Sequence, residues 1–209
     1  LDVACGPGRL TMAFAERVKH ATGVDATEAL LGIARSESSE RGIRNIEFAN
    51  GTALDLAFPE AAFDIVSCRA AFHHFDAPDA VITEIKRVTN PGGQFLIAFI
   101  IGNEYATTAS RHDELERLCD PTHVHCLPAT QFNALFASAG LEITNSWQRS
   151  MSYDVNGWIE HGGPSESVAT EIRRVLKENL EQDQTGLAVR EEDGELRFSH
   201  QTVVYLLTK

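Results

Sequence analysis

Long apolar runs, paired cysteines and positive charge are all scarce in this sequence. No apolar stretch approaches the length of a bilayer-spanning helix, and no secretory signal is visible. The four cysteines form no C-x-x-C pair, so reduced thiols in a cytoplasmic chain are the default expectation. Only 18 Lys and Arg residues stand against 30 Asp and Glu, a formal net charge of −12. This acidity disfavours nucleic acid as a partner, because such binding depends on neutralising phosphates.

The first ten residues carry the most informative local pattern. Leu1 to Ala4 is typical of the end of a buried strand, and Cys5-Gly6-Pro7-Gly8 follows without a bulky side chain. From about Arg9, apolar residues recur at helical spacing. Glycines let a backbone approach a ligand closely, and the start of a helix offers unpaired N–H groups. The pattern therefore predicts the opening strand, turn and helix of a nucleotide-binding α/β fold.

The spacing of the glycines distinguishes between classes of nucleotide. In the dinucleotide fingerprint G-x-G-x-x-G the third glycine would fall on Thr11, which disfavours NAD and FAD. The run Asp2 to Gly8 instead resembles the first motif, D-x-G-x-G-x-G, of class I methyltransferases that depend on S-adenosylmethionine (SAM). Ala4 replaces the first glycine of that motif. The resemblance implies that Asp2, Ala4, Gly6 and Gly8 help to bind SAM.

Asp25 ends the second expected strand, at the distance from the glycine turn where an acidic residue binds ribose hydroxyls. Thr27 is expected to cap the following helix, which would leave the Asp25 carboxylate free. In the methyltransferases that the chain resembles, the residues after this acid lie against the adenine. The resemblance thus implies Ala26 and Leu30 as cofactor contacts, although Leu30 serves equally well as plain core.

Two later segments also resemble motifs of these methyltransferases. Gly51 to Pro59 is similar to G-D-A-x-x-L-P-F, with Thr52 in place of the aspartate that binds the adenine amino group. The Thr52 hydroxyl or the Ala53 backbone is the expected substitute. The next strand, Phe63 to Cys68, resembles the family's fourth strand, and the resemblance implies that backbone carbonyls near Cys68 and Arg69 hold the methionine amino group.

His73 and His74 follow that strand and are expected over the cofactor sulfur. A neutral histidine can take a proton from an acceptor hydroxyl or amine at pH 7, so both are candidate catalytic residues. The alternative is structural, with one ring packed on a neighbouring helix and the other bonded to a backbone group. Many methyl transfers need no protein base.

Alternating strands and helices predict the fold. With 209 residues, 43% of them hydrophobic, we expect one domain over 1–209. The expected architecture is α/β: a Rossmann-like, doubly wound, mostly parallel seven-stranded sheet. The resemblance to class I methyltransferases implies that the last strand, 198–207, is antiparallel and lies beside the fifth. Residues 102–127 and 150–195 are expected as insertions on the substrate side. Because Leu1 already lies inside a strand, we also expect that an N-terminal helical segment is missing.

The second half of the chain carries fewer clear signals. Tyr153, Trp158 and His161 are expected either to line the acceptor pocket or to form a small core of their own. Cys119, His123, His125 and Cys126 match no common zinc spacing, so no metal is expected and a loop near the acceptor is favoured.

Taken together, the motifs resemble the type 11 methyltransferases, similar to those of ubiquinone and menaquinone biosynthesis, in an uncharacterised bacterial branch. The resemblance implies methyl transfer from SAM to a small-molecule acceptor, leaving S-adenosylhomocysteine. Three alternatives stay open: an RNA methyltransferase, a nicotinamide oxidoreductase, and a SAM-binding protein without turnover. The net charge disfavours the first and Thr11 the second.

Overall fold

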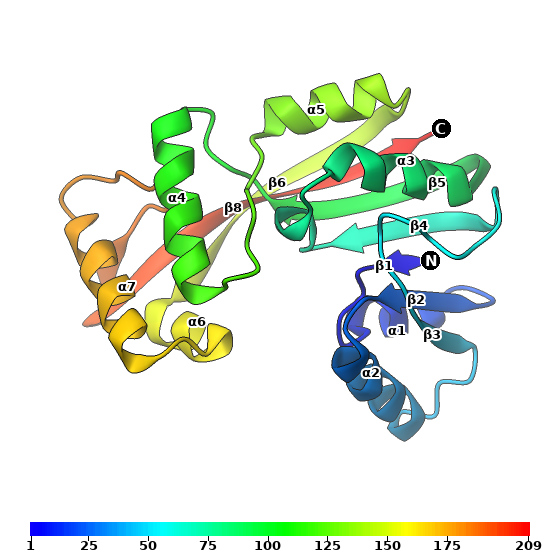
Figure 1. The fold of residues 1–209 in the computed structure, drawn as a ribbon, viewed down its shortest axis with the longest axis horizontal. Helices are drawn as coiled ribbons and strands as arrows, with labels where there is room; N and C mark the ends of the chain where they lie inside the picture. Colours follow the sequence, from blue (N-terminus) through cyan, green and yellow to red (C-terminus); the bar gives the residue numbers. More distant parts are fainter.

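One mixed β-sheet organises the chain, and the computed structural model describes all of it, residues 1–209 (Figure 1). The strand order is β3-β2-β1-β4-β5-β8-β6, and a short β7 pairs with β8 off this path. The strands are β1 (Asp2–Val3), β2 (Ala21–Asp25), β3 (Ile46–Asn50), β4 (Phe63–Arg69), β5 (Thr89–Ile100), β6 (Glu142–Asp154), β7 (Arg190–Glu192) and β8 (Glu195–Thr208).

The direction of the strands confirms the predicted Rossmann-like fold. Strands β1 to β5 pair in parallel, whereas β8 runs antiparallel between β5 and β6. The seven strands of the path match the prediction, and β7 is an addition within the expected insertion 150–195. Asp193 and Gly194, both at positive φ, join β7 to β8. A two-residue Asp-Gly turn of this kind is a strong hairpin signal.

Helices alternate with these strands along the chain. They are α1 (Arg9–Ala15), α2 (Glu28–Glu40), the single 3₁₀ turn η1 (Phe72–His74), α3 (Pro78–Val88), α4 (Ala106–Cys119), α5 (Ala129–Ser138), α6 (Val155–Gly162) and α7 (Glu166–Glu178). None of them combines the length and the apolar character needed to cross a lipid bilayer. Side chains of α3 and α5 pack over the central strands in the main core, where Phe95, Ile97 and Phe99 of β5 alternate inward.

Strands β6 and β8 extend well beyond the rest of the sheet. Only residues 202–208 of β8 pair with β5, whereas its pairing with β6 continues to Arg197 opposite Asp154. Helices α4, α6 and α7 pack on this projecting part (Figure 1) and share a second apolar core with Phe198. We call these three helices and the projecting ends of β6 and β8 the outer lobe. The lobe faces the carboxyl ends of the parallel strands, so it borders the edge where such sheets bind ligands.

Candidate active site at the carboxyl edge of the sheet

The glycine loop joins β1 to α1 with three residues in the left-handed region. Ala4, Gly6 and Gly8 have φ angles of 53°, 54° and 74°. A Cβ atom at Gly8 would lie 2.7 Å from the Phe48 ring and 2.9 Å from the Ala34 side chain, so only glycine fits there. A Cβ atom at Gly6 would meet nothing within 4 Å, which means that the loop is open at this residue.

Asp25 lies directly beside this loop. Its Oδ2 accepts a hydrogen bond of 2.8 Å from the Gly6 N–H, and its Oδ1 accepts one of 2.8 Å from the Thr27 N–H. The expectation that Thr27 caps α2 and leaves Asp25 free is therefore wrong, because the Thr27 side chain makes no capping bond. A carboxylate offers about four lone-pair directions, so each oxygen retains capacity to accept another hydrogen bond.

Asp2 is held behind the loop by its neighbours. It is buried, and it accepts hydrogen bonds from the Thr11 hydroxyl at 2.8 Å and the Ser67 hydroxyl at 2.7 Å. Burial raises the pKa of Asp2, while these two hydrogen bonds oppose the rise. Thr11, which stands where the dinucleotide fingerprint has glycine, thus ties α1 to β1, and Asp2 supports the loop from within.

The residues expected on the adenine side gather around the ends of β2 and β3. Ala26 and Thr52 are exposed, Leu30 is half-buried and Ala53 is buried. The Thr52 hydroxyl accepts a 3.2 Å hydrogen bond from the backbone N–H two residues on, but it retains donor capacity. Asn50, opposite Asp25 in the β2–β3 register, donates its side-chain amide to the Ala26 carbonyl. Sequence reasoning missed Asn50, for which strand pairing was the only signal.

The loop carrying Thr52 and Ala53 is anchored by an ion pair on α3. The Arg87 guanidinium donates to Glu84 and also to the Leu56 and Phe58 carbonyls, at 2.7 and 2.8 Å. Glu84 in turn accepts a 2.8 Å hydrogen bond from the Leu56 N–H. Glu84 and Arg87 therefore position the segment after β3.

At the end of β4 one side chain is buried and the next is exposed. The Cys68 side chain is fully buried in the main core, whereas Arg69 is exposed. Ala70 then turns the chain at a φ of 55°, and its N–H donates to the Ala98 carbonyl. This turn leads directly into η1.

A buried aromatic ring fixes the position of η1. Phe72 packs edge-on against Phe75 and Phe132 in the main core. The His73 carbonyl accepts hydrogen bonds from the Val124 and His125 N–H groups, which holds the segment 120–127 against η1. The structure thus brings both candidate histidines to the boundary between the sheet and the outer lobe.

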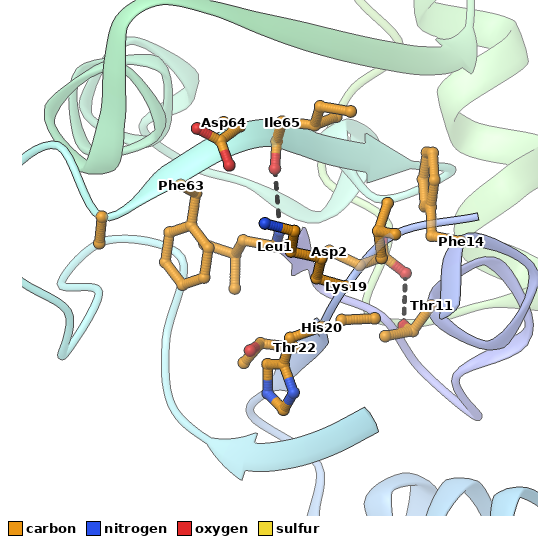
Figure 2. Close-up of a pocket in the computed structure, with 13 residues that line it drawn as sticks. Leu1, Asp2, Thr11, Phe14, Lys19, His20, Thr22, Phe63, Asp64 and Ile65 are labelled. Carbon is orange, nitrogen blue, oxygen red and sulfur yellow. Dashed lines mark hydrogen bonds between the residues drawn. The ribbon is translucent and has the colours of Figure 1, made fainter. Parts of the chain in front are cut away.

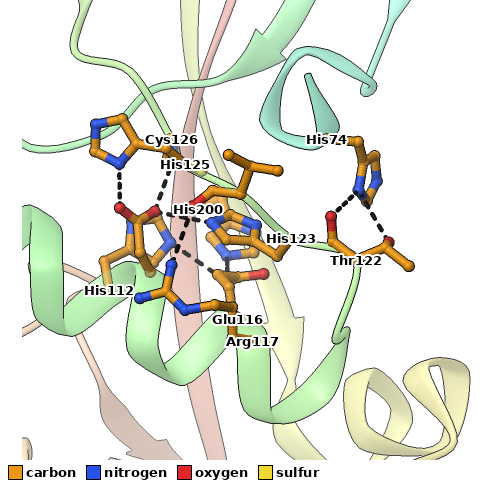
Figure 3. A network of polar contacts seen from close by, with 11 residues as sticks. His74, His112, Glu116, Arg117, Thr122, His123, His125, Cys126 and His200 are labelled. Atoms are coloured by element: carbon orange, nitrogen blue, oxygen red, sulfur yellow. Dashed lines mark hydrogen bonds and ion pairs between the residues drawn. The ribbon is translucent and has the colours of Figure 1, made fainter. Parts of the chain in front are cut away.

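The two histidines have different chemical environments. Burial, together with the neighbouring imidazoles of His74 and His123, lowers the pKa of His73 to about 3. His74 Nδ1 lies 3.2 Å from the Thr122 carbonyl, which can only accept, so this nitrogen carries the proton (Figure 3). Its Nε2 therefore presents a lone pair, 3.9 Å from an Asp120 carboxylate oxygen.

The low pKa of His73 predicts a contribution to acid sensitivity. In the unfolded chain His73 binds a proton near pH 6.5, whereas in the folded chain its pKa is about 3. The stability of the fold therefore falls as the pH drops through this window. The free energy of unfolding is lower at pH 4.5 than at pH 7.5, and we expect His73→Leu to reduce this difference by about 2 to 3 kcal/mol. Urea unfolding at both pH values tests this, and equal losses in the variant and the unmodified protein would contradict it.

The aromatic residues of the outer lobe mostly form its own core. The Tyr153 ring stacks on Phe198 with centroids 5.5 Å apart, and Trp158 meets the same ring edge-on at 5.0 Å. His161 is exposed at the end of α6. Tyr153 also lies 5.0 Å from the His200 ring, which connects this core to a cluster of histidines.

Cys119, His123, His125 and Cys126 do not converge on one point. The Cys119 thiol donates to a backbone carbonyl of α6. The His123 ring donates instead to Asp113 at 2.8 Å, as does the Cys126 N–H, and His125 contacts the other oxygen of the same carboxylate (Figure 3). This carboxylate, which sequence reasoning missed, organises the segment 120–127.

A cavity of about 490 Å³ lies at the opposite edge of the sheet. Figure 2 shows its lining at the starts of β1, β2 and β4, including Leu1, Thr22, Phe63 and Ile65. Ligands of parallel α/β sheets bind outside the carboxyl ends of the strands. This cavity is therefore separate from the glycine loop and Asp25.

A sheet of this order, with a reversed strand beside β5 and a glycine loop after β1, defines the class I methyltransferase fold. Residues 1–97 match the model of the family Methyltransf_11, described as a methyltransferase domain. Residues 1–97 therefore carry the domain of this family of type 11 methyltransferases.

Named relatives agree with this assignment. The uncharacterized methyltransferase YcgJ of Bacillus subtilis is 34% identical over 165 residues, covering 78% of this chain and 64% of YcgJ. The crystal structure of YcgJ superposes on the whole of this chain, and the match covers 90% of the YcgJ chain, with a TM-score of 0.88 at 28% identity. A putative methyltransferase from Bacillus halodurans superposes over 99% of this chain and 90% of its own, with a TM-score of 0.91 at 25% identity.

The match to enzymes with a named pathway is more local. A ubiquinone biosynthesis O-methyltransferase of Pseudomonas fluorescens is 40% identical over 108 residues. This match covers 51% of the chain and 46% of the enzyme. The chain thus spans about half to two-thirds of the length of these curated relatives.

Proposed function

We propose that this chain binds SAM at the carboxyl edge of its sheet and transfers the methyl group to a small-molecule acceptor. The observation that carries the proposal is the hydrogen bond from the Gly6 N–H to the Asp25 carboxylate. It holds an acidic side chain at the mouth of an open glycine loop, as recognition of a ribose requires.

The residues around the loop fit such a cofactor. The loop is open at Gly6, and both Asp25 oxygens retain lone pairs for ribose hydroxyls. The adenine is assigned to Ala26, Leu30, Thr52 and Ala53, and the methionine part to the Asp2–Gly8 segment and the backbone of Cys68 and Arg69. When bound, SAM would supply a methyl group attached to a positively charged sulfur. This charge already makes the methyl carbon a strong electrophile. The protein then has to orient the acceptor and exclude water.

A small molecule is favoured over RNA as the acceptor. The net charge of −12 offers no broad basic surface for phosphates. The relative with a stated role, the ubiquinone biosynthesis O-methyltransferase, has a small-molecule pathway in its name. We assign the acceptor to the junction between η1 and the outer lobe, because His74 contacts Thr122 of the segment after α4 there.

We assign the role of general base to His74 rather than His73. A base with a pKa of about 3 accepts a proton too weakly to help at neutral pH, which disfavours His73. His74 has its Nδ1 proton engaged by Thr122 and its Nε2 lone pair available, and the nearby Asp120 carboxylate would stabilise the protonated ring. His73 positions the segment 120–127 through its carbonyl.

With a hydroxyl acceptor identified by screening, we expect His74→Gln to lower kcat by about 100-fold or more. SAM affinity is expected to stay within threefold, since His74 lies outside the assigned cofactor contacts. His73→Leu is the matched control and is expected to change kcat by less than tenfold. Steady-state kinetics against pH measure both effects. A normal kcat in His74→Gln would remove the base from the mechanism and leave a transfer that depends on proximity alone.

The cofactor assignment is tested by calorimetry with SAM, S-adenosylhomocysteine and NAD. Micromolar binding of the first two and none of NAD supports the proposal. Binding of NAD alone would overturn it. Binding of SAM without formation of S-adenosylhomocysteine on any acceptor would instead favour a SAM-binding protein without turnover.

A further inference from the structure

Three potential metal ligands meet where α4 crosses the projecting part of β8. His112 and Glu116 lie one turn apart on α4 and therefore share a face of that helix. His200 reaches them from β8 (Figure 3). Their side chains are only 4%, 9% and 2% exposed, and the three ligand atoms lie within 4.8 Å of one another.

One atom of this group lacks a partner. Nε2 of His112 is buried and makes no hydrogen bond, although it lies 3.4 Å from Glu116 Oε1. Buried polar atoms are nearly always satisfied, so an orphaned imidazole nitrogen aimed at a carboxylate requires an explanation. An ion accepting its lone pair would supply the missing partner.

The distances suit a metal ion bound by two imidazoles and a carboxylate. Ligand atoms about 2.1 Å from a common ion lie roughly 3 to 3.4 Å apart. The His112–Glu116 atom pair, at 3.4 Å, matches this spacing. The His200–Glu116 pair, at 2.7 Å, is a hydrogen bond that has to lengthen slightly when an ion enters between the two atoms. Two histidines and one carboxylate form a donor set used by divalent zinc, iron and related transition metals, and unsuited to magnesium or calcium.

The neighbouring trio of Asp113, His123 and Cys126 is a weaker candidate. One Asp113 oxygen already accepts from the His123 ring and the Cys126 N–H, each at 2.8 Å, and the other contacts His125. Both Asp113 oxygens and the His123 Nε2 are therefore satisfied without an ion. Asp113 thus serves as an internal comparison, being an adjacent buried carboxylate on the same helix.

We propose that His112, Glu116 and His200 bind one divalent transition-metal ion, which links α4 to β8. In the metal-free protein the His200 Nε2–H donates to Glu116. On binding, this ring's proton moves to Nδ1 and the metal takes the Nε2 lone pair, so the imidazole stays neutral. The site lies in the outer lobe and shares no residue with the assigned cofactor contacts, so this inference does not depend on the proposed function.

The test uses tag-free protein, stripped with a chelator and then titrated with Zn²⁺ or Co²⁺. We expect one metal per chain by elemental analysis and visible absorption from bound Co²⁺. We also expect a melting temperature raised by roughly 5 °C or more at saturating Zn²⁺, with no change in Mg²⁺.

His112→Gln is the decisive variant, since its imidazole nitrogen makes no hydrogen bond that folding would lose. It is expected to fold and to lose stoichiometric metal, as is Glu116→Gln, whereas the control Cys126→Ser retains it. Circular dichroism verifies folding of each sample. No metal uptake by the unmodified chain overturns the proposal. Uptake that survives His112→Gln and disappears in Cys126→Ser also overturns it, because the ion would then lie at Asp113.

Discussion

Replacing Gly8 by alanine is expected to destabilise the fold by about 3 kcal/mol or more. The added Cβ would enter a space already filled by the Phe48 ring and the Ala34 side chain, and a φ of 74° is strained for any residue with a Cβ. Left-handed strain costs about 1 to 2 kcal/mol and overpacking about 1 to 3 kcal/mol. Thermal unfolding is then expected to shift down by roughly 6 to 12 °C.

Gly6→Ala is the matched control for this change. Gly6 has a similar positive φ of 54°, but its Cβ would meet no atom, and Ala4 already adopts a φ of 53° in the same loop. We expect a loss of only about 1 kcal/mol in stability and at least a tenfold loss in SAM affinity, because the methyl group extends from the open side of the loop. Equal stability of the two variants would contradict the crowding deduced at Gly8.

Asp25→Ala is expected to weaken SAM binding by about 100-fold or more. Hydrogen bonds to a charged group contribute about 1.5 to 3 kcal/mol each, and the variant removes two from the ribose. It also removes the bond that holds the Gly6 N–H. Calorimetry with SAM and S-adenosylhomocysteine measures the loss.

Two further variants separate the ligand effect from damage to the loop. Asp25→Asn keeps one acceptor oxygen for the backbone and is expected to fall between the unmodified protein and Asp25→Ala. Glu28→Gln neutralises a nearby carboxylate that is paired with Arg35 on α2, and it is expected to leave affinity within twofold. If Asp25→Ala bound SAM within threefold of the unmodified chain, the ribose assignment would be wrong.

The parts of the structure predicted correctly depend on short stretches of sequence. The glycine loop and Asp25 belong to one strand–helix–strand unit, and the alternation of β5 is visible within eight residues. The reversed last strand followed from the family resemblance, and the pairing of β8 with β5 confirms it. The Asp193-Gly194 turn is also a local signal. It lies within the expected insertion 150–195, where sequence reasoning did not recognise it as a hairpin turn.

The parts that were missed depend on contacts between distant residues. His200 and Glu116 are 84 positions apart in the sequence, and no local spacing indicates that they are in contact. The i, i+4 spacing of His112 and Glu116 is visible in the sequence, but nothing local indicates that both side chains are buried. The carboxylate of Asp25 was expected to be free because backbone donors from the Gly6 loop have no sequence signature.

The continuity of β6 and β8 limits how the acceptor side of this protein can move. Each strand spans about 40 Å and passes from the central sheet into the outer lobe without a break in its pairing, apart from one irregularity near Ile143. A hinge needs a few residues that absorb large backbone rotations, and a paired two-stranded ribbon offers none here. Opening and closing of the acceptor side would therefore occur by elastic bending of this ribbon. Grafting another enzyme's acceptor side onto this chain would require exchanging the two strands along their whole length.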